Sequence, residues 1–139
     1  MLALEVEEAS SGTYARRDAP DVHRRFTMEV TLTARLLHRP IQLSGTITAD
    51  GIAHNALAVG VVHLVWSRRL MRYELIFSGD DGAAYRFVGE RDLSSRGAAK
   101  DMPGVIVDSR DEEIGLVTAS FDARADLFST LSSLRLRRT

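Results

Sequence analysis

The sequence predicts a mainly β protein: an antiparallel β-sandwich or an up-and-down barrel-like domain of about seven strands with one short C-terminal helix. Apolar and polar residues alternate over several segments, as they do in half-buried strands. Glycine and aspartate turns separate these segments at intervals of roughly 10 residues. Only one late segment has helical periodicity, so a fold of alternating strands and helices is not expected.

The length and composition predict one globular domain. The chain has 139 residues, of which 45% are hydrophobic and 27% charged, and this size and mixture are typical of a single folded domain. Residues 1–25 mix acidic, small polar and basic residues around Pro20 without a period of 2 or 3.6. We therefore expect a loosely ordered N-terminal leader over 1–25 and a single antiparallel β domain over 26–139.

The first half of that domain contains three predicted strands. Alternation is clearest at 26–35, and a second strand at 41–48 ends at Asp50-Gly51, which predicts a tight hairpin. Residues 52–66 are too apolar to alternate cleanly. This pattern predicts a strand that is covered on both faces, or a long strand that bends at Gly60.

The second half contains four more strands and the helix. Segments 71–77 and 83–91 flank a glycine- and aspartate-rich turn and predict a hairpin. Two further strands are expected at 104–109 and 112–121. Asp122 then offers an N-cap to a segment with an apolar stripe of leucines, which predicts a short helix near 122–134 that packs on the sheet.

Charge and residue usage exclude several functions. A net charge of -1, spread along the chain, argues against binding to nucleic acid. The absence of cysteine excludes disulfides and thiolate sites. Neither a signal peptide nor a membrane span is predicted, and we expect a cytoplasmic protein. Lysine occurs once among 18 basic residues, which indicates a GC-rich, bacterial source.

Two stretches, at 68–93 and 113–136, resemble the β-rich accessory segment fused to or encoded beside bacterial cholesterol-oxidase-like flavin oxidoreductases of the glucose–methanol–choline superfamily. The residues that carry the resemblance are Met71-Arg72-Tyr73, Asp81-Gly82, Tyr85 and Gly89 in the first stretch, and Gly115, Asp126-Leu127-Phe128 and Arg135 in the second. The resemblance implies an accessory module with an oxidoreductase partner.

The chain also departs from that pattern. Glu90-Arg91 replaces the usual lysine after the second glycine, and no flavin-binding G-x-G-x-x-G motif follows a predicted strand. Oxidase activity and a flavin cofactor therefore cannot be transferred to this chain, and we expect no cofactor.

No catalytic or metal-binding constellation emerges from the sequence, so we expect a protein that is not an enzyme. The four histidines lack metal-ligand spacing. His54 and His63 are an odd number of residues apart and would face opposite sides of a strand unless Gly60 introduces a bulge. The acidic pairs are explained by turns, and no serine lies in a nucleophile elbow. A small barrel enzyme that uses His63 as a base is a third hypothesis.

The candidate ligand-binding residues come from the predicted interior and from a basic turn. Arginine beside aromatic rings suits a carboxylate or phosphate, and an apolar interior forms a solid core in a sandwich but can hold an apolar ligand in a barrel. The expected interior residues are Met28, Leu43, Leu64, Trp66, Met71, Tyr73, Phe77 and Phe87. The candidate site comprises His63, Trp66, Arg72, Tyr73, Tyr85 and Phe87.

Two hypotheses follow. The first is a non-catalytic domain that binds an apolar, lipid-like small molecule or serves as an accessory module to an oxidoreductase. The alternative is a structural or interaction protein that forms a homodimer or a hetero-complex without a small ligand. In both cases we expect a homo-oligomer.

Overall fold

The structure, a computed structural model, describes residues 2–35, 38–94, 100–121 and 135–138. It is built almost entirely of strands, which run in chain order as β1 (Leu2–Arg16), β2 (His23–Arg35), β3 (His38–Ala49), β4 (Ala53–Val65), β5 (Leu70–Ser78), β6 (Ala84–Asp92), β7 (Asp101–Val107), β8 (Glu113–Phe121) and β9 (Arg135–Arg138). One turn of 3-10 helix, η1 (Trp66–Arg68), joins β4 to β5.

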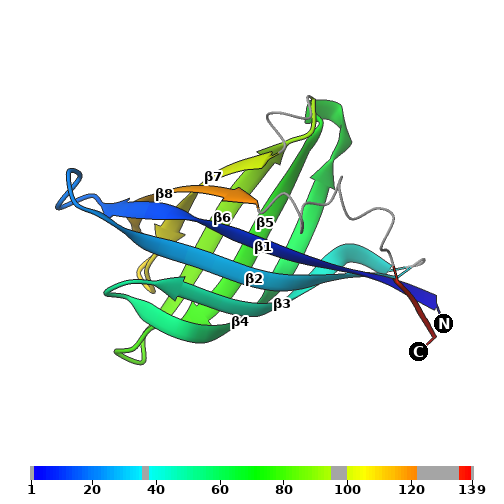
Figure 1. Ribbon diagram of the computed structural model, residues 1–139, viewed down its shortest axis with the longest axis horizontal. Helices are drawn as coiled ribbons and strands as arrows, with labels where there is room; N and C mark the ends of the chain where they lie inside the picture. The colour runs from blue at the N-terminus through cyan, green and yellow to red at the C-terminus, as the bar shows by residue number, and fades with distance from the viewer. Residues whose placement is uncertain (1, 36–37, 95–99, 122–134, 139) are drawn as a thin grey trace.

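The strands close into an eight-stranded antiparallel barrel. From β2 to β8 the strands are neighbours in chain order. Strand β8 then pairs with β1, and β1 pairs with β2, which closes the sheet. The sheet therefore has no free edge between β1 and β2, and the protein is a barrel rather than a sandwich. The short β9 pairs with the first residues of β1, so the two ends of the described chain lie side by side (Figure 1).

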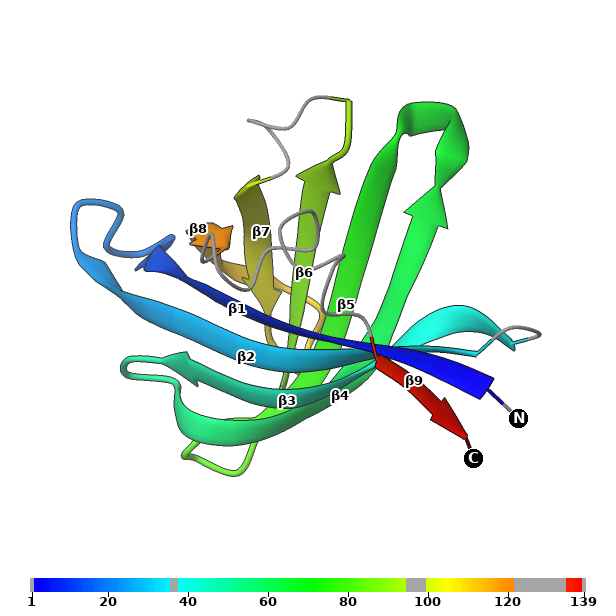
Figure 2. The ribbon, with the colours of Figure 1, turned by 45° about the vertical axis from the view of Figure 1, so that its right-hand side comes forward.

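Strand β4 carries the sheet from one side of the barrel to the other. Figure 2 shows β4 running first beside β3 and then rising beside β5. A side chain at Gly60 would overlap the carbonyl oxygen of Glu74 and the Cα of Leu75, so glycine is required where β4 and β5 approach. The prediction of a long strand with a special role for Gly60 matches this arrangement.

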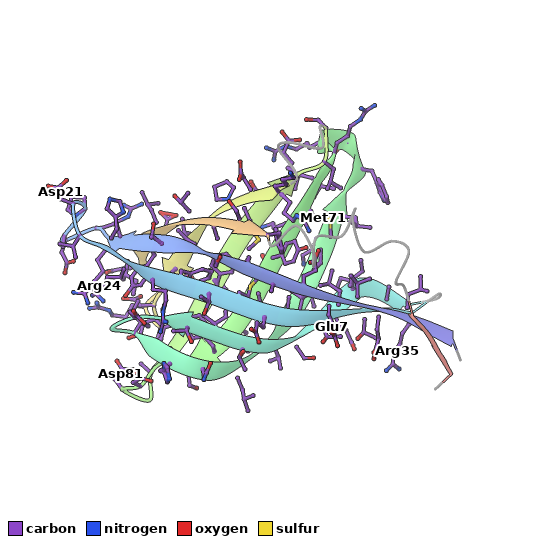
Figure 3. The ribbon with its side chains drawn as sticks, viewed as in Figure 1. Glu7, Asp21, Arg24, Arg35, Met71 and Asp81 are labelled. Atoms are coloured by element: carbon purple, nitrogen blue, oxygen red, sulfur yellow. The ribbon has the colours of Figure 1, made fainter. Side chains whose placement is uncertain are left out.

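The predicted turns are confirmed. Gly51 has φ of +89° between β3 and β4, and the amide of Ile52 donates to the Ala49 carbonyl over 2.8 Å, which makes the tight hairpin expected at Asp50-Gly51. The β5–β6 hairpin is also present, and Figure 3 labels Asp81 at its tip.

The prediction of a loosely ordered leader over 1–25 is wrong. Residues 2–16 form β1, which is paired with β2 along nearly its whole length and is part of the barrel wall. The inward positions of β1 from Val6 onward are Val6, which packs against the core, followed by Glu8, Ser10, Gly12 and Tyr14. Because Glu8, Ser10 and Gly12 interrupt the apolar inner face between Val6 and Tyr14, the strand lacks the continuous apolar alternation by which other strands were recognised.

The prediction of about seven strands is therefore close but incomplete, since β1 adds an eighth to the barrel. The predicted helix near 122–134 lies outside the described residues. Within the described part of the chain, no helix is long and apolar enough to cross a membrane.

The inward face of the barrel forms one hydrophobic core. Met28, Leu43, Met71, Tyr73, Phe77 and Phe87 are buried as predicted. Leu64 and Trp66 were also expected inside, but they are 37% and 68% exposed. The expectation that β4 is covered on both faces is likewise wrong, because Leu57 and Val59 on its outer face are 81% and 60% exposed.

Candidate functional site

A cluster of polar side chains lies inside the otherwise apolar barrel. It consists of Glu8 and Ser10 from β1, Tyr73 from β5 and Arg91 from β6, and we call it the interior polar cluster. All four are at most 4% exposed. Each occupies an inward position of its strand, so the alternation of the barrel wall directs their side chains into the interior.

Hydrogen bonds join three members of the cluster. The Tyr73 hydroxyl donates to Glu8 Oε1 over 2.6 Å, and Arg91 Nη1 donates to Glu8 Oε2 over 2.7 Å. The same Arg91 nitrogen donates to the Tyr73 oxygen over 3.1 Å. Both oxygens of the Glu8 carboxylate are therefore engaged, as burial of a charge requires.

The ring of Phe121, at the end of β8, is the apolar neighbour of this cluster. The Arg91 guanidinium carbon lies 3.8 Å from the centre of the ring, a distance typical of cation–π contacts. The Tyr73 ring lies 5.9 Å from the same ring and is tilted by 44°. Phe121 thus packs against the charged pair without adding a polar group.

The Ser10 hydroxyl is buried without a partner among the described residues. Ser10 is 4% exposed, and its Oγ has no hydrogen-bond partner in the part of the chain that the structure describes. Arg35 Nε is the other buried side-chain atom there without a partner. Buried polar groups are nearly always hydrogen-bonded, so Ser10 marks a place where the interior lacks a partner group.

Burial strongly perturbs Tyr73. Removal from water raises the pKa of its phenol well above the usual value of 10.0, and the neighbouring Glu8 carboxylate raises that pKa further, whereas Arg91 lowers it. Tyr73 is therefore a neutral hydrogen-bond donor over the physiological range. A phenol held in this way cannot serve as a base near pH 7.

The cluster lies toward one end of the barrel. Arg91 pairs with Met71, and Figure 3 places Met71 well away from Asp81 at the tip of the β5–β6 turn. On this side β1 pairs with β8 only through residues 10–16 and with β9 only through residues 2–5. Residues 6–9, which include Glu8, thus have a strand partner on one side only within the described chain.

The rest of the interior is packed with apolar side chains. Phe26 and Phe87 are fully buried, with ring centres 5.1 Å apart. The Phe87 ring also lies over two inward glycines: a Cβ atom would meet Phe87 Cζ at 2.7 Å from Gly89, and Phe87 Cε1 at 2.7 Å from Gly104. Glycine at these positions makes room for the ring.

Only one of the six predicted site residues belongs to the interior polar cluster. Tyr73 is a member, whereas Phe87 is part of the solid core. Tyr85 is half-buried, stacks on Phe77, and donates to Asp81 Oδ2 over 3.0 Å.

The other three lie on the outside of the barrel. His63 and Arg72 are directly paired across β4 and β5, and both approach Glu74, with nitrogen to oxygen distances of 3.8 Å and 3.4 Å. Trp66 is exposed in η1. The structure therefore does not bring His63, Trp66 and Arg72 together with Tyr73, Tyr85 and Phe87. Strand alternation sends His63 and Arg72 to the outer face, and Trp66 lies beyond the end of β4 in η1.

The histidine arrangement also differs from the expectation. His54 and His63 are both exposed, rather than on opposite faces. The cause is a register irregularity near the start of β4, where Asn55 has φ of +46° and its amide donates to Thr48 Oγ1 over 3.0 Å. Among the described residues, no three acidic, histidine or cysteine side chains are arranged to hold a metal.

Several open hollows are lined by described residues, among them one beside Arg68, Glu90 and Asp101 and two others. One is lined by Glu7, Glu29 and the hydroxyls of Thr31, Ser44 and Thr46. The other lies beside Arg16, Arg17 and His23. In the second, Arg16 and Arg17 are already paired with Asp18 and Glu113, so their charges are largely neutralised.

Three members of the cluster, Glu8, Ser10 and Arg91, were missed by the sequence analysis. A signal existed for Arg91, because it continues the inward series Tyr85, Phe87 and Gly89 of β6. The signal for Glu8 and Ser10 is weaker, because in this part of β1 only Val6 and Tyr14 flank them as inward apolar residues. Acidic and hydroxyl side chains at alternate positions are ordinarily taken for the solvent face of a strand.

Comparison with models of known protein families, with curated proteins and with solved structures found no match for this chain. The resemblance to the accessory segment of flavin oxidoreductases stays a prediction. Any functional argument therefore depends on the geometry of the barrel interior.

Proposed function

We propose that this barrel is a non-catalytic binding protein for a small, mostly apolar molecule, which it receives in its interior beside the interior polar cluster. The observation that carries the proposal is the unsatisfied Ser10 hydroxyl next to the buried Glu8–Arg91 ion pair. Ligand sites are typically apolar cavities with a few placed polar groups, and this end of the interior has that composition.

The energetics favour a binding role over a purely structural one. Replacing a buried ion pair by packed apolar side chains is often neutral or stabilising. A core selected only for stability therefore gains little from a buried Glu–Arg pair, and it loses from a serine without a partner. Ser10 and Gly12 also occupy successive inward positions, so β1 projects little side-chain volume there.

The protonation and hydrogen bonding of Tyr73 and Glu8 favour a non-catalytic role. Tyr73 is held neutral, and both Glu8 oxygens are hydrogen-bonded. His63, the base of the third hypothesis, is on the outer surface, away from the interior. The Glu74 carboxylate oxygen that lies 3.8 Å from His63 Nε2 is also on the outside of the barrel.

Native mass spectrometry of gently purified protein tests the proposal. We expect a retained adduct of small mass that disappears on denaturation. Ser10→Leu, which fills the interior beside β1, should abolish the adduct, and the matched control Ser11→Leu, on the exposed outer face of β1, should retain it. An adduct-free spectrum, together with no binding of added apolar probes, would identify the interior as a solid core.

A second candidate function is an interaction protein, and an outer apolar surface favours it. Leu57 and Val59 of β4 and Ile76 of β5 are 81%, 60% and 58% exposed, and Val59 and Ile76 are directly paired. Contiguous exposed apolar side chains often mark contacts with another protein. Light scattering would test this role: Leu57→Glu should convert a dimer to a monomer, while Ser11→Glu, on the exposed face of β1 and separated from β4 by β2 and β3, should not.

The two roles are compatible. An accessory module could hold an apolar molecule inside the barrel and contact an oxidoreductase partner through its outer surface. The partner and a cytoplasmic location both stay predictions.

A further inference from the structure

We infer that the polar group of the ligand is uncharged, a hydroxyl or a carbonyl, and that it binds Ser10 Oγ. This inference rests on the proposed function and adds the chemical class of the ligand. Three observations support it: the chemistry of the unsatisfied group, the charge balance around it, and the apolar side chains that flank it.

The chemistry of Ser10 suits a neutral group. A serine hydroxyl donates one hydrogen bond and accepts others, so it complements either an alcohol or a ketone. The hydroxyl is removed from water, and no described residue offers it a hydrogen-bond partner. A ligand oxygen at this position restores the hydrogen bond that burial has removed.

The charge balance argues against an ionic group. Glu8 and Arg91, the charged members of the cluster, have opposite charges and lie 2.7 Å apart. A carboxylate or an ammonium placed beside them would be an additional charge in a region shielded from water. The Tyr73 hydroxyl already donates to Glu8 over 2.6 Å, so it stabilises the acid of the pair rather than an incoming anion.

The neighbours of Ser10 suit an apolar body. In the sheet Ser10 lies between Met28 of β2 and Phe121 of β8, and both are buried. Methionine is flexible and can adjust to the shape of a ligand. A hydrocarbon chain next to these side chains would leave its single oxygen beside the Ser10 hydroxyl.

Isothermal titration calorimetry with four probes of equal chain length tests the inference. The probes are 1-octanol, 2-octanone, octanoate and octylamine, at pH 7, where the last two are charged. We expect octanol and octanone to bind at least 10-fold more tightly than octanoate and octylamine. Tighter or equal binding of a charged probe would overturn the inference and leave the proposed function standing, whereas binding of none of the probes would overturn both.

Variants of the protein test the role of Ser10 itself. Ser10→Ala should weaken octanol binding by about 5- to 10-fold, the scale of one neutral hydrogen bond. The control Ser11→Ala removes a hydroxyl from the outer face of the same strand and should leave the affinity unchanged. Thermal unfolding of both variants verifies that they fold. An unchanged octanol affinity in folded Ser10→Ala would overturn the assignment of this hydroxyl.

Discussion

Glu8 on β1 and Arg91 on β6 form an ion pair of 2.7 Å in which both side chains are 0% exposed. The two residues are far apart in the sequence, and the closed barrel brings them together. A buried pair of this kind makes each partner dependent on the other, because either charge alone would lie in an apolar interior.

Removing one partner should therefore cost more than removing both. We expect Arg91→Met to lower the free energy of unfolding by about 3–5 kcal/mol, since it leaves the Glu8 carboxylate without its cation. The double variant Glu8→Leu/Arg91→Met should lose less than the sum of the two single variants. A double-mutant cycle from urea unfolding measures this coupling. If the losses in unfolding free energy of the two single variants simply add up in the double variant, the two residues do not depend on each other.

Ser10→Ala should stabilise the ligand-free protein. The substitution removes a buried hydroxyl that has no partner, and relief of such a group is worth about 1 kcal/mol or more. Ser11→Ala, on the exposed face, should change stability by less than about 0.5 kcal/mol. A gain in stability from Ser10→Ala, combined with weaker binding of octanol, is the pattern expected when a binding residue is retained at a cost to stability. A marked loss of stability would instead indicate a structural role for this hydroxyl.

The stability of the protein should fall above about pH 10, the pKa of an unperturbed tyrosine. Burial raises the pKa of Tyr73 well above 10.0 in the folded state. Above pH 10 the unfolded chain therefore releases a proton that the folded protein retains, so the unfolded state binds fewer protons and stability decreases with pH. Below pH 10 the stabilising contribution is fully present.

Tyr73→Phe tests this pH dependence. The variant should be less stable at pH 7, because Glu8 loses a hydrogen bond, but its stability should fall less steeply above pH 10. Some decrease should remain, since burial also raises the pKa of Tyr14 and Tyr85. Urea midpoints across the alkaline range measure the slopes. Identical slopes in the two proteins would contradict the assignment to Tyr73.

The glycines beneath Phe87 should differ in their tolerance of a methyl group. At Gly89 the atoms nearest to the new Cβ belong to side chains, Phe87 Cζ at 2.7 Å and Met102 Cγ at 2.8 Å. At Gly104 it would also meet the backbone oxygen of Val88 at 2.6 Å, which cannot move aside as easily. Both alanine variants should lose stability, on the overpacking scale of about 1–3 kcal/mol, with the greater loss at Gly104.

A smaller residue at position 87 should affect the alanine variants at Gly89 and Gly104 differently. Phe87→Leu should offset part of the loss from Gly89→Ala, because the ring is the main obstacle there, and less of the loss from Gly104→Ala. Thermal unfolding of the single and double variants provides the comparison. Equal rescue at both positions would show that the backbone contact at Gly104 is unimportant.

Most of the barrel wall could be predicted from the sequence because its strands have an apolar inner face. From Phe26 to Phe121 the alternation of apolar and polar residues, and turn residues such as Gly51 and Gly82, located β2 to β8. Closure could not be predicted, because it depends on β1. That strand carries Glu8, Ser10 and Gly12 inward, and its polar inner face resembles a disordered segment.

The candidate site was harder to predict for the same reason. Sequence reasoning searched for apolar and aromatic residues, and it placed Tyr73 and Phe87 inside correctly. The polar residues that give the interior its chemistry are inconspicuous in sequence: Arg91 lies between charged neighbours, and Glu8 follows another glutamate. Their burial is a consequence of barrel closure, which no local pattern encodes.

The pairing of β1 with both β2 and β8 also determines the order in which the protein can assemble. Strand β1 is synthesised before β2 and can form a hairpin with it at once, but Ser10 must wait for Phe121 before the barrel closes. Such long-range pairing slows folding. Until then, a nascent chain exposes a long unpaired edge on β1 and keeps Glu8 in contact with water. We therefore expect the burial of this carboxylate to be among the final steps of folding, and a chain that stops short of β8 to leave an edge open to aggregation.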